Sequence, residues 1–74
     1  MDFKKIEEQF KQKLRSVYDQ HKSLQDQFDA DEFCTMFSIK YKNGLPQQPL
    51  EPEGKKLDPT TYQLVLAAFN DVYP

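Results

Sequence analysis

A largely apolar stripe along the first 28 residues constrains the fold of this chain more than any other feature. Successive members stand three or four residues apart: Phe3, Ile6, Phe10, Leu14, Val17, His21, Leu24 and Phe28. The spacing follows the roughly 3.6-residue turn of an α-helix, so it predicts one amphipathic helix over about residues 2–27. That helix would be about 38–40 Å long, longer than a 74-residue globule is wide if its radius of gyration is about 11 Å. The stripe therefore needs cover from the rest of the chain or from a partner.

The same stripe also raises the alternative of a coiled coil. Positions 3, 10, 17 and 24 repeat every seven residues as Phe, Phe, Val and Leu. A coiled coil needs a second apolar position in each heptad, but the heptad positions that follow Ile6 are the polar residues Lys13 and Gln20. A packing face of ordinary helical period is favoured over a long coiled coil. We expect the interaction surface of the protein on this helix, with these residues: Phe3, Ile6, Phe10, Leu14, Val17 and Leu24.

Length and composition favour self-association. A chain of 74 residues forms one small domain that buries only about 60% of its unfolded surface. Cys34 is the single cysteine, so no disulfide can form within the chain. A marginal core beside a long apolar stripe predicts a homodimer. One cysteine and a charged N-terminus without an apolar targeting segment predict a cytoplasmic location. The longest uncharged apolar run, Tyr62 to Asn70, is far too short to cross a membrane.

Residues 29–44 allow two interpretations. As a helix over about 30–42, the segment would begin at the N-cap Asp29, with Glu32 in a capping-box position, and would stop at Asn43-Gly44. As a strand over 33–41, its side chains would alternate and Asn43-Gly44 would be a hairpin turn. The continuation contains Pro46, Pro49 and Pro52, which cannot donate to a strand ladder. We therefore favour the helix and keep the strand as the alternative.

The remainder divides into a connector and a last helix. Residues 43–57 predict a proline-rich extended connector, which we expect to pack Leu45, Leu50 and Leu57 onto the helices. Asp58 followed by Pro59 is a helix start signal, because Asp caps free N–H groups and proline suits the first helical position. The last helix is expected over about 59–72. The predicted fold is thus one all-α domain over 1–74, a bundle of two to three helices, with an α+β fold as the alternative.

Little in the chain points to catalysis or to a bound cofactor. His21 and Cys34 are the strongest candidates for a nucleophile, a base or a soft-metal ligand, but one of each is too few for a zinc site. Asp29, Asp31 and Glu32 begin like a calcium loop, yet Phe33 and Cys34 occupy positions that need an oxygen ligand and glycine. We expect no catalytic residue, no metal site and no cofactor, and therefore no enzyme.

A row of basic side chains supports a second hypothesis about function. Lys4, Lys11, Arg15 and Lys22 fall along one side of the first predicted helix. Such a row can follow a nucleic-acid backbone, but interleaved acidic residues neutralise much of it. The favoured interpretation is a non-enzymatic protein–protein interaction or regulatory module that presents an amphipathic helix. The alternative is a small nucleic-acid-binding regulator that uses these basic residues.

Overall fold

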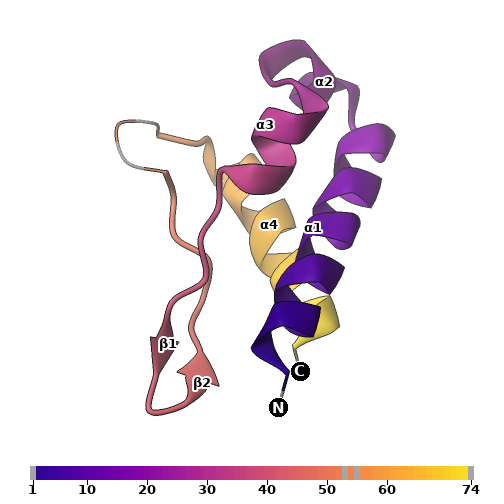
Figure 1. Ribbon diagram of the computed structural model, residues 1–74. Coiled ribbons are helices and arrows are strands. Elements are labelled where there is room, and N and C mark those ends of the chain that lie inside the picture. The colour runs from indigo at the N-terminus through magenta and orange to yellow at the C-terminus, as the bar shows by residue number, and fades with distance from the viewer. Residues whose placement is uncertain (1, 53, 55, 74) are drawn as a thin grey trace.

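The computed structural model describes residues 2–52, 54 and 56–73. In this part of the chain the helices are α1 (Phe3–Gln20), α2 (Lys22–Gln27), α3 (Ala30–Thr35) and α4 (Pro59–Val72) (Figure 1). Between α3 and α4 lies an antiparallel hairpin of two short strands, β1 (Tyr41–Lys42) and β2 (Leu45–Pro46). The prediction of a small, mostly helical bundle is confirmed, and the hairpin is an addition to it.

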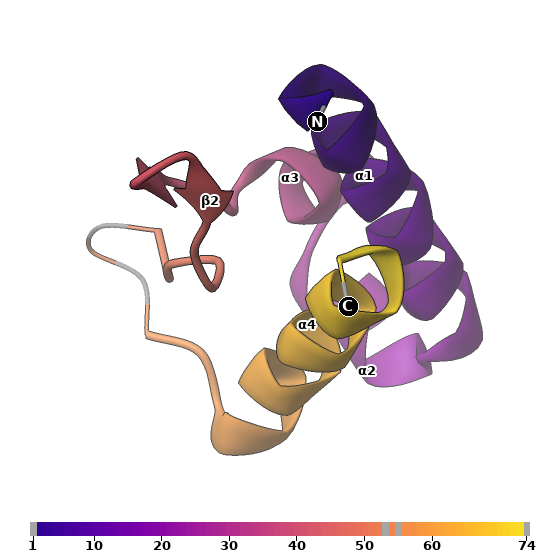
Figure 2. The ribbon, with the colours of Figure 1, turned by 90° about the horizontal axis from the view of Figure 1, so that it is seen from below.

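The core forms where α1, α3 and α4 meet. Figures 1 and 2 show α3 and α4 on the same side of α1, and both helices contact it. Aromatic rings fill the centre. Phe10 packs edge to face against Phe69 with the ring centroids 6.1 Å apart, and Phe33 packs in the same way against Phe37 with the centroids 5.6 Å apart. Such pairs add about 0.5–1.5 kcal/mol to the burial of the rings themselves. The aromatic side chains therefore supply much of the burial available to so short a chain.

The predicted continuous helix over 2–27 is wrong at one residue, His21. Its backbone is extended, with φ −127° and ψ 104°, and this residue separates α1 from α2. The break lets the chain turn back over the core, so that Leu24 is completely buried and Phe28 packs beside it. A straight helix would carry Phe28 about 39 Å from the start of α1, beyond the 36 Å longest dimension of the molecule.

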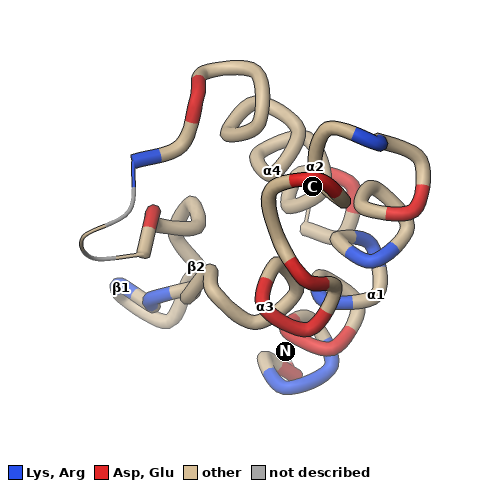
Figure 3. Tube along the Cα trace, turned by 90° about the horizontal axis from the view of Figure 1, so that it is seen from above, with Lys and Arg blue, Asp and Glu red and all other residues tan. Residues whose placement is uncertain are grey.

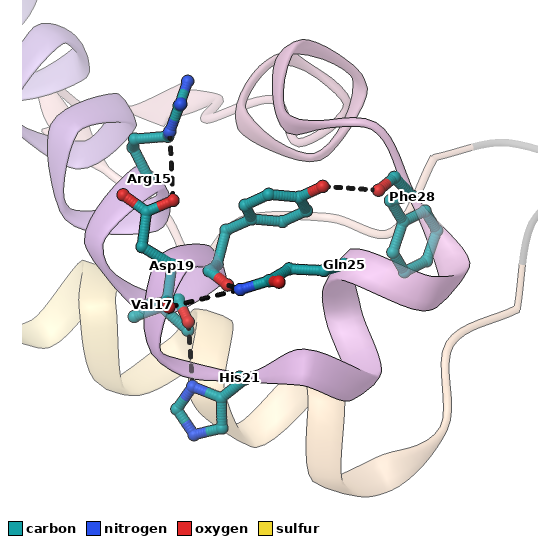
Figure 4. A network of polar contacts seen from close by, with 7 residues as sticks. Arg15, Val17, Asp19, His21, Gln25 and Phe28 are labelled. Carbon is teal, nitrogen blue, oxygen red and sulfur yellow. Dashed lines mark hydrogen bonds and ion pairs between the residues drawn. The ribbon is translucent and has the colours of Figure 1, made fainter.

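Side chains near the break satisfy the carbonyl groups that the end of α1 leaves free. His21 Nδ1 lies 2.8 Å from the carbonyl oxygen of Val17, and Gln25 Nε2 donates to the carbonyls of Tyr18 and Asp19 at 3.0 and 3.2 Å (Figure 4). At the far end of α2, the hydroxyl of Tyr18 donates to the carbonyl of the C-cap residue Phe28 at 2.8 Å. Because helix ends need such partners, these polar contacts compensate for the hydrogen bonds lost at the break.

The predicted helix over 30–42 is wrong beyond α3. The chain leaves the helix after Thr35, and Asn43-Gly44 is a hairpin turn with positive φ at both residues, 54° and 77°. The alternative strand over 33–41 is wrong at its start, which is helical, although it identified the turn correctly. The hairpin prevails because its alternation directs Phe37, Ile39 and Tyr41 toward α1, which a helix could not do for all of them.

The prolines do not prevent the hairpin, because they occupy positions at which the strand ladder uses no N–H group. Gln47 N donates to the carbonyl of Lys40 at 2.7 Å, so the neighbouring pair, Tyr41 and Pro46, exchanges no hydrogen bond. Pro46 therefore loses nothing by lacking an N–H group. The next hydrogen bond of the ladder comes from Leu50, whose N–H donates to the carbonyl of Ser38 at 3.2 Å. Pro49, the residue before it, is therefore also at a position that needs no N–H group.

The last helix matches its prediction in both bounds, 59–72. Asp58 is the N-cap, and its carboxylate accepts a 2.6 Å hydrogen bond from the backbone N–H of Thr61. This bond holds the pKa of Asp58 below its ordinary value, because the charged form is the better acceptor. The connector before the helix is fastened by Tyr62, whose hydroxyl donates to the carbonyl of Pro49 at 2.9 Å.

Candidate interaction surface

The hairpin has one face turned toward the helices and one turned outward. Directly opposed residues of an antiparallel pair share a face, so Tyr41 lies with Pro46, and Lys42 lies with Leu45. The inner face continues through buried Phe37 and half-buried Ile39. We call the opposite side the basic face, and its exposed residues are Ser38, Lys40, Lys42, Leu45, Gln47 and Leu50.

Two leucines are exposed on the basic face. Leu45 keeps 52% of its surface exposed and Leu50 keeps 46%. The prediction that the connector packs both leucines onto the helices is therefore wrong, although half-buried Leu57 does pack against the core. The register explains the difference, because the rings of Pro46 and Pro49 lie on the inner face and are buried there. Apolar side chains beside lysines give this face an amphipathic character.

The two edges of the hairpin differ in their capacity to accept another strand. On the second strand, Pro46 and Pro49 fall where an N–H group would point away from the hairpin, and proline has none to offer a neighbour. On the first strand, the N–H and C=O groups of Ile39 and Tyr41 point away from the hairpin partner. Among residues 2–52, 54 and 56–73, neither residue makes a backbone hydrogen bond outside the hairpin. We call residues 39–42 the open edge, and Figures 1 and 3 place β1 at the rim of the molecule.

Tyr41 fastens the open edge to the start of α1. Its ring packs against Phe3, tilted by 39° and with the ring centroids 4.4 Å apart, and its hydroxyl donates a 2.7 Å hydrogen bond to the Glu7 carboxylate. Partial burial, this hydrogen bond and the negative charge of Glu7 together raise the pKa of Tyr41 to about 12. The hydrogen bond to Glu7 and the contact with Phe3 together hold the edge strand against α1.

The charge of the hairpin is of one sign. Residues 36–50 contain two lysines, Lys40 and Lys42, and no Asp or Glu. Both lysines are exposed on the basic face, and Figure 3 shows blue positions at β1 without a red one among them. Glu7, the acidic group that meets the hairpin from α1, contacts its inner face through Tyr41. The open edge is therefore suited electrostatically to an acidic segment.

A small cavity lies between α1 and the segment that leads into β1. Its volume is about 230 Å³. One wall comes from Glu7, Phe10 and Lys11 of α1, and the other from the chain between Thr35 and Ile39. The Phe10 and Phe37 rings provide an apolar floor, while the charged and hydroxyl groups are more exposed.

The structure places the residues predicted to form the interaction surface largely inside the chain's own core. Ile6, Phe10, Leu14 and Leu24 are buried, and the rest of the stripe is half-buried. Phe3 touches Tyr41, and Val17 packs against the core. The buried residues offer no surface to a second chain in this fold, so a homodimer through them would require the fold to open. The cover that the stripe needed comes from α3, α4 and the hairpin.

The basic row is split by the break at His21. Lys4, Lys11 and Arg15 lie on α1 and Lys22 begins α2, and all four are exposed. Arg15 Nε lies 3.3 Å from a carboxylate oxygen of Asp19. Figure 3 shows both positive and negative residues on α1. The arrangement does not produce a continuous strip of one charge.

The two residues considered for chemistry lie in structural positions. His21 contacts the end of α1, as described above, and Cys34 is half-buried in α3, where desolvation raises the pKa of its thiol. A thiol with a raised pKa is a weaker nucleophile at neutral pH. Within the described residues, no group of three or more His, Cys, Asp or Glu side chains could hold a metal ion. In the same part of the chain, no helix is long and apolar enough to cross a membrane.

Sequence reasoning missed the open edge, although two signals for it were present. One is Asn43-Gly44 between residues of alternating character. The other is the spacing of Pro46 and Pro49, which fits positions on a twisted two-stranded hairpin whose N–H groups are not needed for its ladder.

Comparison with known proteins adds no relative: no family model, curated protein or solved structure matches this chain.

Proposed function

We propose that this protein is a non-enzymatic protein–protein interaction module that binds an extended, acidic segment of another protein along its open edge. The observation that carries the proposal is the unpaired backbone of Ile39 and Tyr41 beside two exposed lysines, on a hairpin without acidic residues. A segment that adds as a strand gains affinity from main-chain hydrogen bonds and specificity from alternate side chains.

The pattern of side chains defines the partner further. Residues of an added strand that oppose Ile39 and Tyr41 would face α1, where apolar groups are favoured. Residues that oppose Lys40 and Lys42 would lie on the basic face, where carboxylates are favoured. The partner is therefore a segment in which acidic and less polar residues alternate.

Charge favours such a partner over a second copy of this chain. In an antiparallel pairing of two open edges centred on Tyr41, Lys40 opposes Lys42 of the second copy. In a pairing centred on Lys40, the Lys40 side chains of the two copies oppose each other. Like charges directly opposed are destabilising, and lysines on an edge are a common protection against self-pairing. The proposal accordingly takes a different protein as the partner and does not include a homodimer.

A binding titration with a designed peptide tests the proposal. The probe is the capped peptide Glu-Thr-Glu-Leu-Glu-Thr-Glu, and the control is Glu-Glu-Thr-Leu-Thr-Glu-Glu, which has the same composition without the alternation. Calorimetry should detect binding of the alternating peptide only. Equal binding of both peptides would indicate charge attraction without strand addition and would contradict the proposal, as would binding of neither.

N-methylation of the probe separates strand addition from other modes of binding. Each residue of an added strand directs its N–H group either toward the open edge or away from it. One probe carries methyl groups on its Thr and Leu nitrogens, and a second carries them on its Glu nitrogens. Strand addition requires that one of these two peptides loses binding while the other retains it. Retention of binding by both would exclude main-chain pairing.

A further inference from the structure

The cavity between α1 and residues 35–39 adjoins the open edge. It shares Ile39 with that edge, and its opposite wall is the first half of α1, the region to which Tyr41 is fastened. A residue added across from Ile39 would have its Cβ about 4.5–5.5 Å from that of Ile39. Its side chain would then point toward α1, where the cavity lies.

The size and lining of the cavity decide what it can hold. Its volume of about 230 Å³ is smaller than the roughly 300–1,000 Å³ of typical small-molecule sites. The Phe10 and Phe37 rings form an apolar floor beside Ile39, and the polar part of the lining comes from half-buried Glu7 and from exposed Lys11, Thr35 and Ser38. An apolar floor beneath a polar rim fits a single large side chain whose backbone stays at the surface.

We infer that this cavity is a specificity pocket that receives one large apolar side chain, aliphatic or aromatic, from the added strand. The inference rests on the proposed function, because the strand brings the side chain to the pocket. Lys11 lies at the rim, and it makes no ion pair within the described residues. Its aliphatic stem can therefore lie against the bound side chain while its ammonium group stays in water.

A peptide series measures the contribution of the pocket. The probes are Glu-Thr-Glu-X-Glu-Thr-Glu with Ala, Leu or Phe at the central position X. Filling the pocket should raise affinity from Ala to the better of Leu and Phe by about tenfold or more, since each buried methylene group contributes about 0.8 kcal/mol. Equal affinity of all three peptides would contradict the inference.

A pocket-blocking variant shows where that side chain binds. Thr35 is exposed and lines the pocket, so Thr35→Phe should fill it and remove the preference for large X. Thr60→Phe is the matched control, because Thr60 is exposed on α4 and does not line the pocket. Lys11→Phe blocks the rim from the other wall, with Lys22→Phe as its control, and circular dichroism confirms the fold of each variant.

The possible outcomes separate the two proposals. If Thr35→Phe and Lys11→Phe abolish the preference and their controls keep it, the pocket is the binding place of X. If the preference persists in both blocked variants while one N-methylated probe loses binding, strand addition stands and the pocket inference is wrong. If the wild-type protein binds none of the three peptides, both proposals are wrong.

Discussion

The hydroxyl of Tyr41 donates a 2.7 Å hydrogen bond to the carboxylate of Glu7, across 34 positions of sequence. This bond and the tilted ring contact of Tyr41 with Phe3 join the hairpin to the first two turns of α1. The open edge is therefore held against the helical core at β1 as well as by its chain connection to α3.

Replacing Glu7 by Gln should lower the pKa of Tyr41 from about 12 toward its ordinary value of 10.0. The variant removes the negative charge and the strong acceptor, while the desolvation of the ring remains. The measurement is the near-ultraviolet absorbance of tyrosinate during an alkaline titration, with Tyr41→Phe identifying the signal of this residue. An unchanged titration in Glu7→Gln would show that the bond is not formed in solution.

The same bond predicts a loss of stability in alkali. The pKa of Tyr41 is raised in the folded state, so the stabilisation is complete below the unfolded value of 10.0 and is lost as pH rises toward about 12. Denaturant titrations of the wild type and Tyr41→Phe should therefore differ at neutral pH and converge in this range. A constant difference across the range would contradict the assignment.

Leu24→Ala should destabilise the protein by about 2–5 kcal/mol, the usual cost of truncating a buried leucine. Leu24 is completely buried because the break at His21 returns α2 to the core. Ser23→Ala is the control, since Ser23 is exposed beside it. Chemical denaturation followed by circular dichroism measures both variants. A cost of Leu24→Ala no larger than that of its control would mean that α1 and α2 form one straight helix.

Asp58→Ala should lower the denaturant midpoint, because Thr61 would lose the acceptor that caps α4. Asp58→Asn keeps an oxygen acceptor and should lose less. The pKa of Asp58 is lowered in the folded state, so the contribution of its charge is present above the unfolded value of 3.8 and disappears as pH falls below it. The difference in midpoint between the wild type and Asp58→Asn should therefore shrink from neutral to acidic pH. A difference that grows in acid would be contrary to this account.

The parts of the fold that sequence predicted well are those with local causes. The start of α4 depends on Asp58 and Pro59, which act on their own neighbours, and its bounds were predicted correctly. The apolar spacing likewise identified the buried face of α1. These signals require no knowledge of the rest of the chain.

The parts that were mispredicted depend on distant contacts. His21 has no strong tendency to end a helix, and the break follows from the burial that Leu24 gains against the core. Residues 36–42 had local signals for both helix and hairpin, and contacts of Tyr41 with Phe3 and Glu7 favour the hairpin. The candidate site was missed because it consists of backbone left unpaired by that arrangement, and the signals for the hairpin at Asn43-Gly44 and at the prolines were weighed below the helix signals.

Replacing Lys40 and Lys42 by Thr should promote self-association of the protein through the open edge. The substitution removes the like-charge opposition between two copies, and threonine suits an edge strand. Sedimentation velocity should show a monomeric wild type and a dimerising double variant. Replacing Lys4 and Lys22 by Thr is the control for net charge. A wild type that already dimerises, with no change in the double variant, would contradict the role given to these lysines.

The measurement that tests the central claim most directly is amide hydrogen exchange at Ile39 and Tyr41, followed by NMR with and without the alternating Glu-Thr-Glu-Leu-Glu-Thr-Glu peptide. Both N–H groups point outward from the open edge, so strand addition predicts that the peptide slows the exchange of one or both at least about tenfold beyond any change at α4. Saturating peptide that leaves the exchange of both amides unchanged would contradict the claim that this edge is the binding site.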